Sequence, residues 1–149
     1  MSEPAIVGIH HVKFPVTALA RSRDWYEQVF NLTPLFEFAD EDGVVLGVAY
    51  QPIGPDGVAI ALRENPEVAR AIAGFDPVSF AIADRAAADS WIHRLDALGI
   101  AHSPVIDATI GWLVVFQDPD GTDIHLYSVE RHGLDQTGKA RRGRAAATA

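Results

Sequence analysis

The residues best suited to chemistry in this chain are its histidines, because the 149-residue sequence holds six of them and no cysteine. The lack of thiols excludes disulfides, zinc–thiolate sites and thiol catalysis, so any bound metal must be held by imidazole, carboxylate or water. His11 and His125 stand out, because each lies in an alternating apolar stretch typical of a β-strand. Imidazole suits zinc, iron, nickel and cobalt, and two such ligands leave positions for water and a chelating substrate.

Two copies of one sequence pattern position these histidines. Residues 12–16 (VKFPV) align with residues 78–82 (VSFAI) at a separation of 66 positions. Later in each copy the offset becomes 64, because residues 54–57 (GPDG) match residues 118–121 (DPDG). Pro-Asp-Gly supplies the fixed φ and the glycine that a tight turn between two strands needs. The sequence therefore predicts a tandem duplication.

Each copy is predicted to form a strand, a helix and three further strands. The helices are expected to begin at Thr17 and Asp84, whose side-chain oxygens suit an N-terminal cap, and residues 64–75 form the connector. The predicted strands are 7–16, 34–39, 44–51 and 57–63 in the first copy, and 76–82, 102–107, 111–117 and 122–129 in the second. The predicted fold class is α+β, with two tandem βαβββ modules that form a concave mixed sheet and carry their helices on its outer side.

Alternation along the strands separates a helix-covered face from an open face. Val12, Phe14 and Val16 form the apolar set expected beneath the first helix. The open face carries polar side chains from the first and last strands of the copies, namely His11, Lys13, Ser79, His125 and Tyr127. The sequence thus predicts a polar-lined hollow that takes a small-molecule ligand.

Three segments carry a resemblance to a known family: residues 8–12 (GIHHV), residues 19–26 (LARSRDWY), and residues 118–121 with the strand that follows. They resemble the vicinal oxygen chelate superfamily, which includes glyoxalase I, fosfomycin-resistance transferases, extradiol dioxygenases and bleomycin-resistance proteins. The likeness covers residues 6–130. It implies the fold described above, but it does not define the reaction, because the family keeps its scaffold and changes its chemistry.

The family places metal ligands on the first and last strands of each module. Carried onto this chain, these positions fall on His11, Ala61, Pro77 and His125, of which only the two histidines can bind a metal. Typical enzymes of the family have a Glu at the last-strand position of at least one module, and Ala61 and His125 depart from that pattern. The departure counts against glyoxalase-type proton transfer and leaves the two-His, one-Glu iron site of extradiol dioxygenases incomplete.

Other polar residues are candidates for substrate contact or proton transfer. Lys13, Ser79 and Gln117 are predicted to bind substrate, and Lys13 suits an anionic one. Tyr127 and His102 are the candidate catalytic groups, and His102 is also a candidate third metal ligand. Each has a structural alternative, such as a surface lysine or a half-buried tyrosine with its hydroxyl in solvent.

Two residue groups near these candidates are expected to be structural. His10 neighbours His11, but strand alternation turns it toward the opposite face. Asp118 and Asp120 are expected to be turn residues, since Pro119 and Gly121 explain their segment without catalysis. The sequence contains no glycine-rich phosphate loop, no Gly-x-Ser-x-Gly elbow and no His-Glu-x-x-His motif.

Two functions remain open on the sequence alone. In the first, His11 and His125 hold a divalent ion (zinc, iron, nickel, manganese or cobalt) that polarises two neighbouring oxygens of a small oxygen-rich metabolite. Such an enzyme would be a lyase, an isomerase or a dioxygenase of the glyoxalase type. In the second, the chain is a metal-free binding protein for an antibiotic or metabolite, which Ala61 and Pro77 favour because they remove half of the ligand set.

Length and composition indicate one globular domain at residues 1–130, with modules at about 6–64 and 76–130. The last stretch, residues 131–149, holds five cations and one carboxylate and is predicted to be a disordered basic tail.

Charge and hydropathy limit the partners. The net charge of -8 argues against nucleic acid as a partner, because a nucleic-acid groove needs clustered Lys and Arg. No apolar run approaches the roughly 18 residues of a membrane span, and residues 1–4 lack a signal-peptide pattern, so we expect no membrane partner and a cytoplasmic location. The resemblance implies a homodimer.

Overall fold

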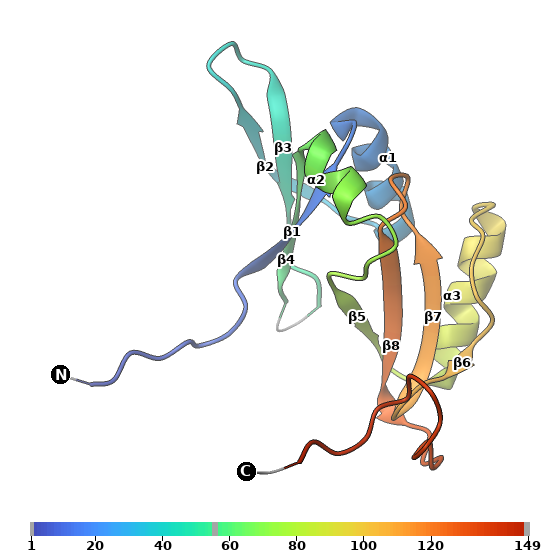
Figure 1. Ribbon diagram of the computed structural model, residues 1–149. Helices are drawn as coiled ribbons and strands as arrows, with labels where there is room; N and C mark the ends of the chain where they lie inside the picture. Colours follow the sequence, from blue (N-terminus) through green and yellow to red (C-terminus); the bar gives the residue numbers. More distant parts are fainter. Residues whose placement is uncertain (1, 55–56, 148–149) are drawn as a thin grey trace. The chain divides into compact units, whose positions relative to one another are not determined.

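A computed structural model describes residues 2–54 and 57–147 (Figure 1). Its contacts divide the chain into two units. Unit 1 contains the chain up to Ala73 together with Asp118–Gly121, and unit 2 contains Gly74–Gln117 and the chain from Thr122 onward. None of the helices in the described residues is long and apolar enough to cross a membrane.

Unit 1 is a four-stranded sheet covered by a helix. Its elements are β1 (His11–Val16), α1 (Leu19–Phe30), β2 (Pro34–Ala39), β3 (Val45–Tyr50), β4 (Ala59–Glu64) and α2 (Pro66–Ala71). The strand order is β1-β4-β3-β2, in which β1 and β4 are parallel and the other pairs are antiparallel. The helix α1 packs against β3 and β4.

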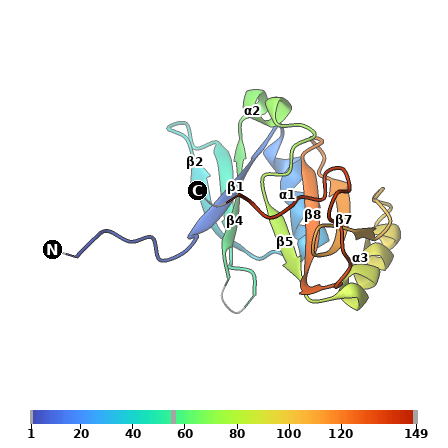
Figure 2. The same cartoon turned by 60° about the horizontal axis from the view of Figure 1, so that its bottom comes forward.

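Unit 2 repeats this plan. Its elements are β5 (Ser79–Ile82), α3 (Arg85–Ala97), β6 (Ile106–Asp107), β7 (Gly111–Gln117) and β8 (Asp123–Arg131). The strand order β5-β8-β7-β6 again pairs the first and last strands in parallel. The helix α3 packs along β7 and β8 (Figure 2). The predicted fold class of two βαβββ modules is confirmed.

The strand registers confirm the alignment of the two copies. Lys13 lies opposite Ala61 in the parallel pair of unit 1, and Ser79 lies opposite His125 in that of unit 2. These are the pairs that the offsets of 66 and 64 positions make equivalent. Each sheet therefore places the same two positions side by side on its open face.

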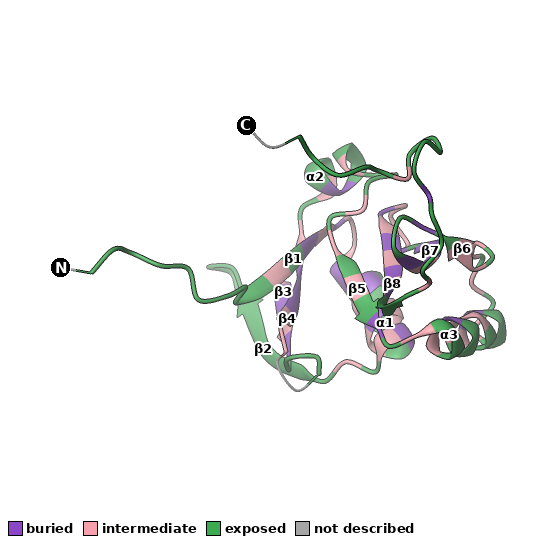
Figure 3. Ribbon diagram, turned by 90° about the horizontal axis from the view of Figure 1, so that it is seen from below, coloured by how far each residue is buried: buried purple, intermediate pink, exposed green. Residues whose placement is uncertain are grey.

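The core of each unit lies between sheet and helix, as strand alternation predicts. In unit 1, Phe14, Val16, Tyr26 and Val29 are all buried. In unit 2, Leu95 on α3 is buried, and so are the inward residues of the last strand, Ile124 and Leu126. The strand β2 differs, because every one of its residues is exposed (Figure 3).

The bounds of several predicted elements need correction. The strand predicted at 76–82 is β5, which begins at Ser79, and the strand predicted at 102–107 is β6, which contains only Ile106–Asp107, while His102 forms an isolated bridge to Phe116. The first strand begins at His11 rather than residue 7, because β4 begins at Ala59, the partner of His11, and Val58 bridges instead to Ile53. The connector contains a short helix, α2, which starts after Asn65, whose side chain accepts a hydrogen bond from the Val68 amide. Residues 2–10 are exposed and lead away from β1 (Figures 1 and 2).

The predicted caps of the two main helices have different outcomes. Asp84 caps α3, because its Oδ1 accepts a 2.8 Å hydrogen bond from the Ala87 amide. Thr17 does not cap α1, since both its amide and its hydroxyl donate to Asp120 in the β7–β8 turn. The first backbone amide of α1, at Leu19, has no acceptor within the helix and donates instead to the side chain of Glu64 at the end of β4.

The chain after β8 packs against the rest of unit 2 over part of its length. The His132 ring lies 2.8 Å from the Ala108 carbonyl oxygen, and Gln136 is buried. Disorder of the basic tail in solution stays a prediction.

Candidate ligand-binding site in unit 1

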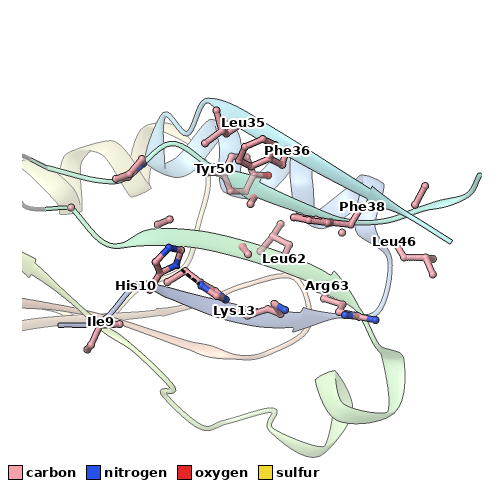
Figure 4. A pocket seen from close by; sticks show the side chains of 18 of the residues that line it. Ile9, His10, Lys13, Leu35, Phe36, Phe38, Leu46, Tyr50, Leu62 and Arg63 are labelled. Carbon is pink, nitrogen blue, oxygen red and sulfur yellow. Dashed lines mark hydrogen bonds between the residues drawn. The ribbon is translucent and has the colours of Figure 1, made fainter. Parts of the chain in front are cut away.

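A cavity of about 1030 Å³ lies on the open face of the unit 1 sheet. Side chains from β1, β2, β3 and β4 line it, together with residues just before β1 (Figure 4). Its volume falls at the upper end of the range for sites that take drug-sized ligands. All of its lining residues belong to unit 1.

Small residues form the floor of the cavity. Gly47 and Ala49 on β3 lie beside Arg63 and Ala61 on β4, and Ala59 precedes them on the same face. Gly47 has a local packing reason, because a Cβ there would lie 3.2 Å from the Leu62 carbonyl oxygen and 3.6 Å from the Phe38 ring. A floor of glycine and alanine leaves the space above the sheet empty.

Aromatic and apolar side chains from β2 form one wall. Phe36 lies opposite Ala49 and Phe38 lies opposite Gly47, so each ring faces a small residue on the neighbouring strand. Their exposed fractions are 59% and 56%. An irregularity in the β2–β3 register between Pro34 and Phe36 brings Leu35 into the same wall. None of these side chains was among the site residues predicted from the sequence.

Two cations stand on the opposite side of the cavity, on β1 and β4. Lys13 is the partner of Ala61, and Arg63 follows two positions later on β4. Neither side chain forms an ion pair or hydrogen bond with any described residue. By contrast, Arg21 and Arg23 on α1 both pair with carboxylates. Lys13 thus lines the cavity, and its role in substrate binding stays a prediction.

Two histidines contact each other at the start of β1. The Nδ1 atoms of His10 and His11 lie 2.9 Å apart, a hydrogen bond in which one ring donates and the other accepts. Both residues line the cavity. The expectation that His10 faces the opposite side is wrong, because the strand starts at His11 and alternation does not extend to the residue before it.

The groups that face α1 are engaged with one another. The hydroxyl of Tyr50 donates to Glu27 at 3.2 Å, and Glu27 also pairs with Arg23. Burial, together with the neighbouring Glu27 carboxylate, raises the pKa of Tyr50, so the phenol stays neutral. Tyr50 thus serves the packing of α1 rather than proton transfer in the cavity.

In unit 2, three predicted site residues lie at or near the β5–β8 pair. His125 pairs with Ser79 in register, and its Nδ1 lies 3.3 Å from Oδ2 of Asp76. Gln117 donates to Asp123 at 2.9 Å across the end of the β7–β8 hairpin. The metal role of His125 and the substrate roles of Ser79 and Gln117 stay predictions.

The two predicted catalytic groups have structural partners. His102 places its Nε2 2.8 Å from Oδ1 of Asp96 on α3 and its Nδ1 2.6 Å from the Ser103 carbonyl. The Tyr127 hydroxyl accepts a 3.0 Å hydrogen bond from the Ile110 amide in the β6–β7 loop. These contacts favour structural roles, and catalysis by either residue stays a prediction.

The fold and the repeat alignment agree with a direct comparison to a family model. The model of the Glyoxalase/Bleomycin resistance protein/Dioxygenase superfamily matches residues 8–126. The chain belongs to this superfamily. The match covers most of both modules and every candidate site residue except Tyr127, and it confirms the resemblance seen in the sequence.

Solved structures of superfamily members share the fold at low sequence identity. A lactoylglutathione lyase from Agrobacterium tumefaciens is 20% identical with a TM-score of 0.68, covering 88% of this chain and 100% of that one. TnmS3, an antibiotic-binding protein from Streptomyces sp. CB03234, is 21% identical with a TM-score of 0.66, covering 85% and 98%. FosX from Listeria monocytogenes, complexed with Mn(II) and sulfate, is 17% identical with a TM-score of 0.60, covering 83% and 91%. No curated protein matches the chain.

Of the four positions at which the superfamily places metal ligands, only two carry a side chain that can bind a metal in this chain. Ala61 presents a methyl group in the cavity floor, opposite the ammonium-bearing Lys13, and Pro77 has no donor. His11 in unit 1 and His125 in unit 2 are the remaining donors. In the described part of the chain, no three His, Asp or Glu side chains form a cluster that could hold a metal ion. Within each unit, the residues present do not fit a complete metal site.

Proposed function

We propose that the unit 1 cavity binds a small, largely apolar molecule without the help of a metal ion. The observation that carries this proposal is the identity of residue 61. At the position where the superfamily places a ligand, this chain has a methyl group that forms part of a smooth apolar floor. Burial of apolar surface against this floor and the β2 wall then provides the driving force for binding.

The members with solved structures make this proposal reasonable within the superfamily. One is described as an antibiotic-binding protein, and another as a lyase, so the shared scaffold serves binding as well as catalysis. Among the described residues, the cavity floor carries no histidine or carboxylate, and the two histidines of the lining bond to each other at the cavity edge. We therefore favour sequestration or transport of a ligand over metal-assisted catalysis.

The test uses phenylnaphthylamine, a neutral dye that fluoresces in apolar sites. We expect saturable binding to the wild-type protein, with the same Kd in EDTA and in excess Mn(II) or Zn(II). Ala61→Phe fills the floor and should abolish the signal. Ala86→Phe, which adds the same side chain at an exposed position of α3, is the matched control and should bind as wild type.

Two outcomes would overturn the proposal. The first is a signal that Ala61→Phe leaves unchanged, because the dye would then bind elsewhere. The second is binding that EDTA removes and a divalent ion restores, with the same loss in His11→Ala and His125→Ala. That second result would establish the metal-dependent alternative, in which these two histidines are ligands.

A further inference from the structure

We infer that the ligand of the unit 1 cavity is a planar aromatic molecule that carries an anionic group. This inference rests on the function proposed above and adds a chemical class to it. The ring system lies against Phe36 and Phe38, and the anion lies between Lys13 and Arg63. Figure 4 shows the two sets on opposite sides of the cavity.

The arrangement of the two cations is the first reason. Lys13 and Arg63 stand on the same face of adjacent strands, two positions out of register. Two like charges on neighbouring strands repel each other, and this cost is relieved when an anion lies between them. The chain has 20 acidic and 12 basic side chains, so carboxylate partners are abundant, yet none of the described carboxylates pairs with either cation.

The carboxylate among the described lining residues is already engaged. Asp40 follows β2, and its Oδ1 accepts hydrogen bonds from the amides of Asp42 and Val44, at 2.9 and 3.0 Å. These bonds stabilise the β2–β3 turn, and they hold the carboxylate there. The positive charges of Lys13 and Arg63 are therefore available to an anionic group of a bound ligand.

The aromatic wall is the second, independent reason. Phe36 and Phe38 project from the same face of β2, which places them roughly 7 Å apart along the strand. Each lies across from a residue too small to cover it, Ala49 or Gly47, and more than half of each side chain is exposed. Exposed apolar surface of this kind marks a binding site, and phenyl rings prefer offset or edge contacts with other aromatic groups.

A matched pair of dyes tests the inference. Anilinonaphthalene sulfonate has the ring system of phenylnaphthylamine with an added sulfonate. We expect the wild-type protein to bind the sulfonate at least tenfold more tightly than the neutral dye, since only the sulfonate accepts charge-assisted hydrogen bonds from Lys13 and Arg63. The advantage should shrink as salt concentration rises, whereas the Kd of the neutral dye should change little.

Variants assign the effect to the named residues. Lys13→Gln with Arg63→Gln should weaken sulfonate binding about tenfold or more, a much larger loss than the one for the neutral dye. Arg85→Gln with Arg131→Gln removes two positive charges in unit 2 and should change neither. Phe36→Leu with Phe38→Leu should weaken both dyes and leave decane sulfonate, an aliphatic anion, less affected. Phe75→Leu changes an exposed phenylalanine outside the cavity and should have no effect.

The outcomes separate this inference from the proposed function. If neither dye binds, or Ala61→Phe has no effect, both fail. If both dyes bind with equal Kd and the Lys13, Arg63 double variant binds as wild type, the cavity binds ligands but the anionic class is wrong. If decane sulfonate binds as tightly as the aromatic sulfonate in every variant, the aromatic class is wrong.

Discussion

The hydroxyl of Tyr26 donates a 2.8 Å hydrogen bond to Oδ2 of Asp118, a residue 92 positions later in the chain. Both side chains are buried, Tyr26 completely and Asp118 to 5% exposure. Asp118 stands in the turn between β7 and β8, yet this turn belongs to unit 1. Two residues further on, Asp120 pairs with Arg21 and accepts from Thr17, so the same turn also serves the start of α1.

Replacing Tyr26 with Phe should lower the free energy of unfolding by about 1–3 kcal/mol, because the buried Asp118 carboxylate loses a donor that water cannot replace. Urea denaturation followed by circular dichroism measures this. The control is Tyr50→Phe, which removes the hydroxyl that donates to Glu27, a carboxylate that is 29% exposed and stays paired with Arg23. An equal loss of unfolding free energy in both variants would show that the Tyr26–Asp118 bond contributes no more to stability than the Tyr50–Glu27 bond.

The fold was predictable because local signals and the repeat agree. Alternation predicted β2 and β7 with their observed bounds. The offsets of 66 and 64 positions make Lys13 and Ala61 equivalent to Ser79 and His125, and the structure shows that both pairs lie in register. The Tyr26–Asp118 bond was not predictable. The sequence explains Asp118 fully as a turn residue, and only the folded chain shows that this turn accepts hydrogen bonds from α1.

The candidate site was predicted in part. Alternation on β1 correctly put Lys13 on the open face, but the same rule misplaced His10, which precedes the strand. Phe36 and Phe38 were not predicted, because they lie on β2, and the resemblance points only to the first and last strands, where the superfamily has its ligands. Their signal was present, since two phenylalanines at alternate positions of one strand pair with Ala49 and Gly47 on the next.

Asp84 is expected to be the more important of the two predicted caps. Its Oδ1 bonds to the Ala87 amide at the start of α3, so Asp84→Ala should lower the free energy of unfolding by about 0.5–2 kcal/mol. Asp89→Ala is the control, since Asp89 is an exposed acid on the same helix that pairs only with Arg85 at 3.3 Å. Thermal denaturation of the two variants compares them, and a larger loss in Asp89→Ala would refute the assignment.

His102 should make stability depend on pH. The Ser103 carbonyl and then the Asp96 carboxylate raise the pKa of His102 above its ordinary value. The folded state therefore binds a proton more tightly than the unfolded state, whose His pKa is about 6.5. This contribution is complete below that pH and is lost as pH rises through the folded-state pKa.

Asp96→Asn should accordingly lower the pKa of His102, as followed by NMR titration of its ring protons. It should also reduce the decline in unfolding free energy above about pH 6.5. His93→Gln removes an exposed histidine from α3 and is expected to leave the decline unchanged. If the His102 titration does not move in Asp96→Asn, the carboxylate has no part in holding the proton.

Homodimer formation is the remaining prediction, and the exposed side chains of unit 1 support it. The β2–β3 turn exposes Val44 by 53%, outside the cavity, and β2 is an edge strand with every residue exposed. Such edges and apolar surfaces associate in water unless they are covered. Light scattering at micromolar concentration should therefore give twice the chain mass of 16.1 kDa.

Val44→Lys places a charge in this surface and should shift the mass toward the monomer, while Val129→Lys, at an exposed position of β8, should not. A wild-type mass of one chain across this range would show that the hairpin stays uncovered in solution.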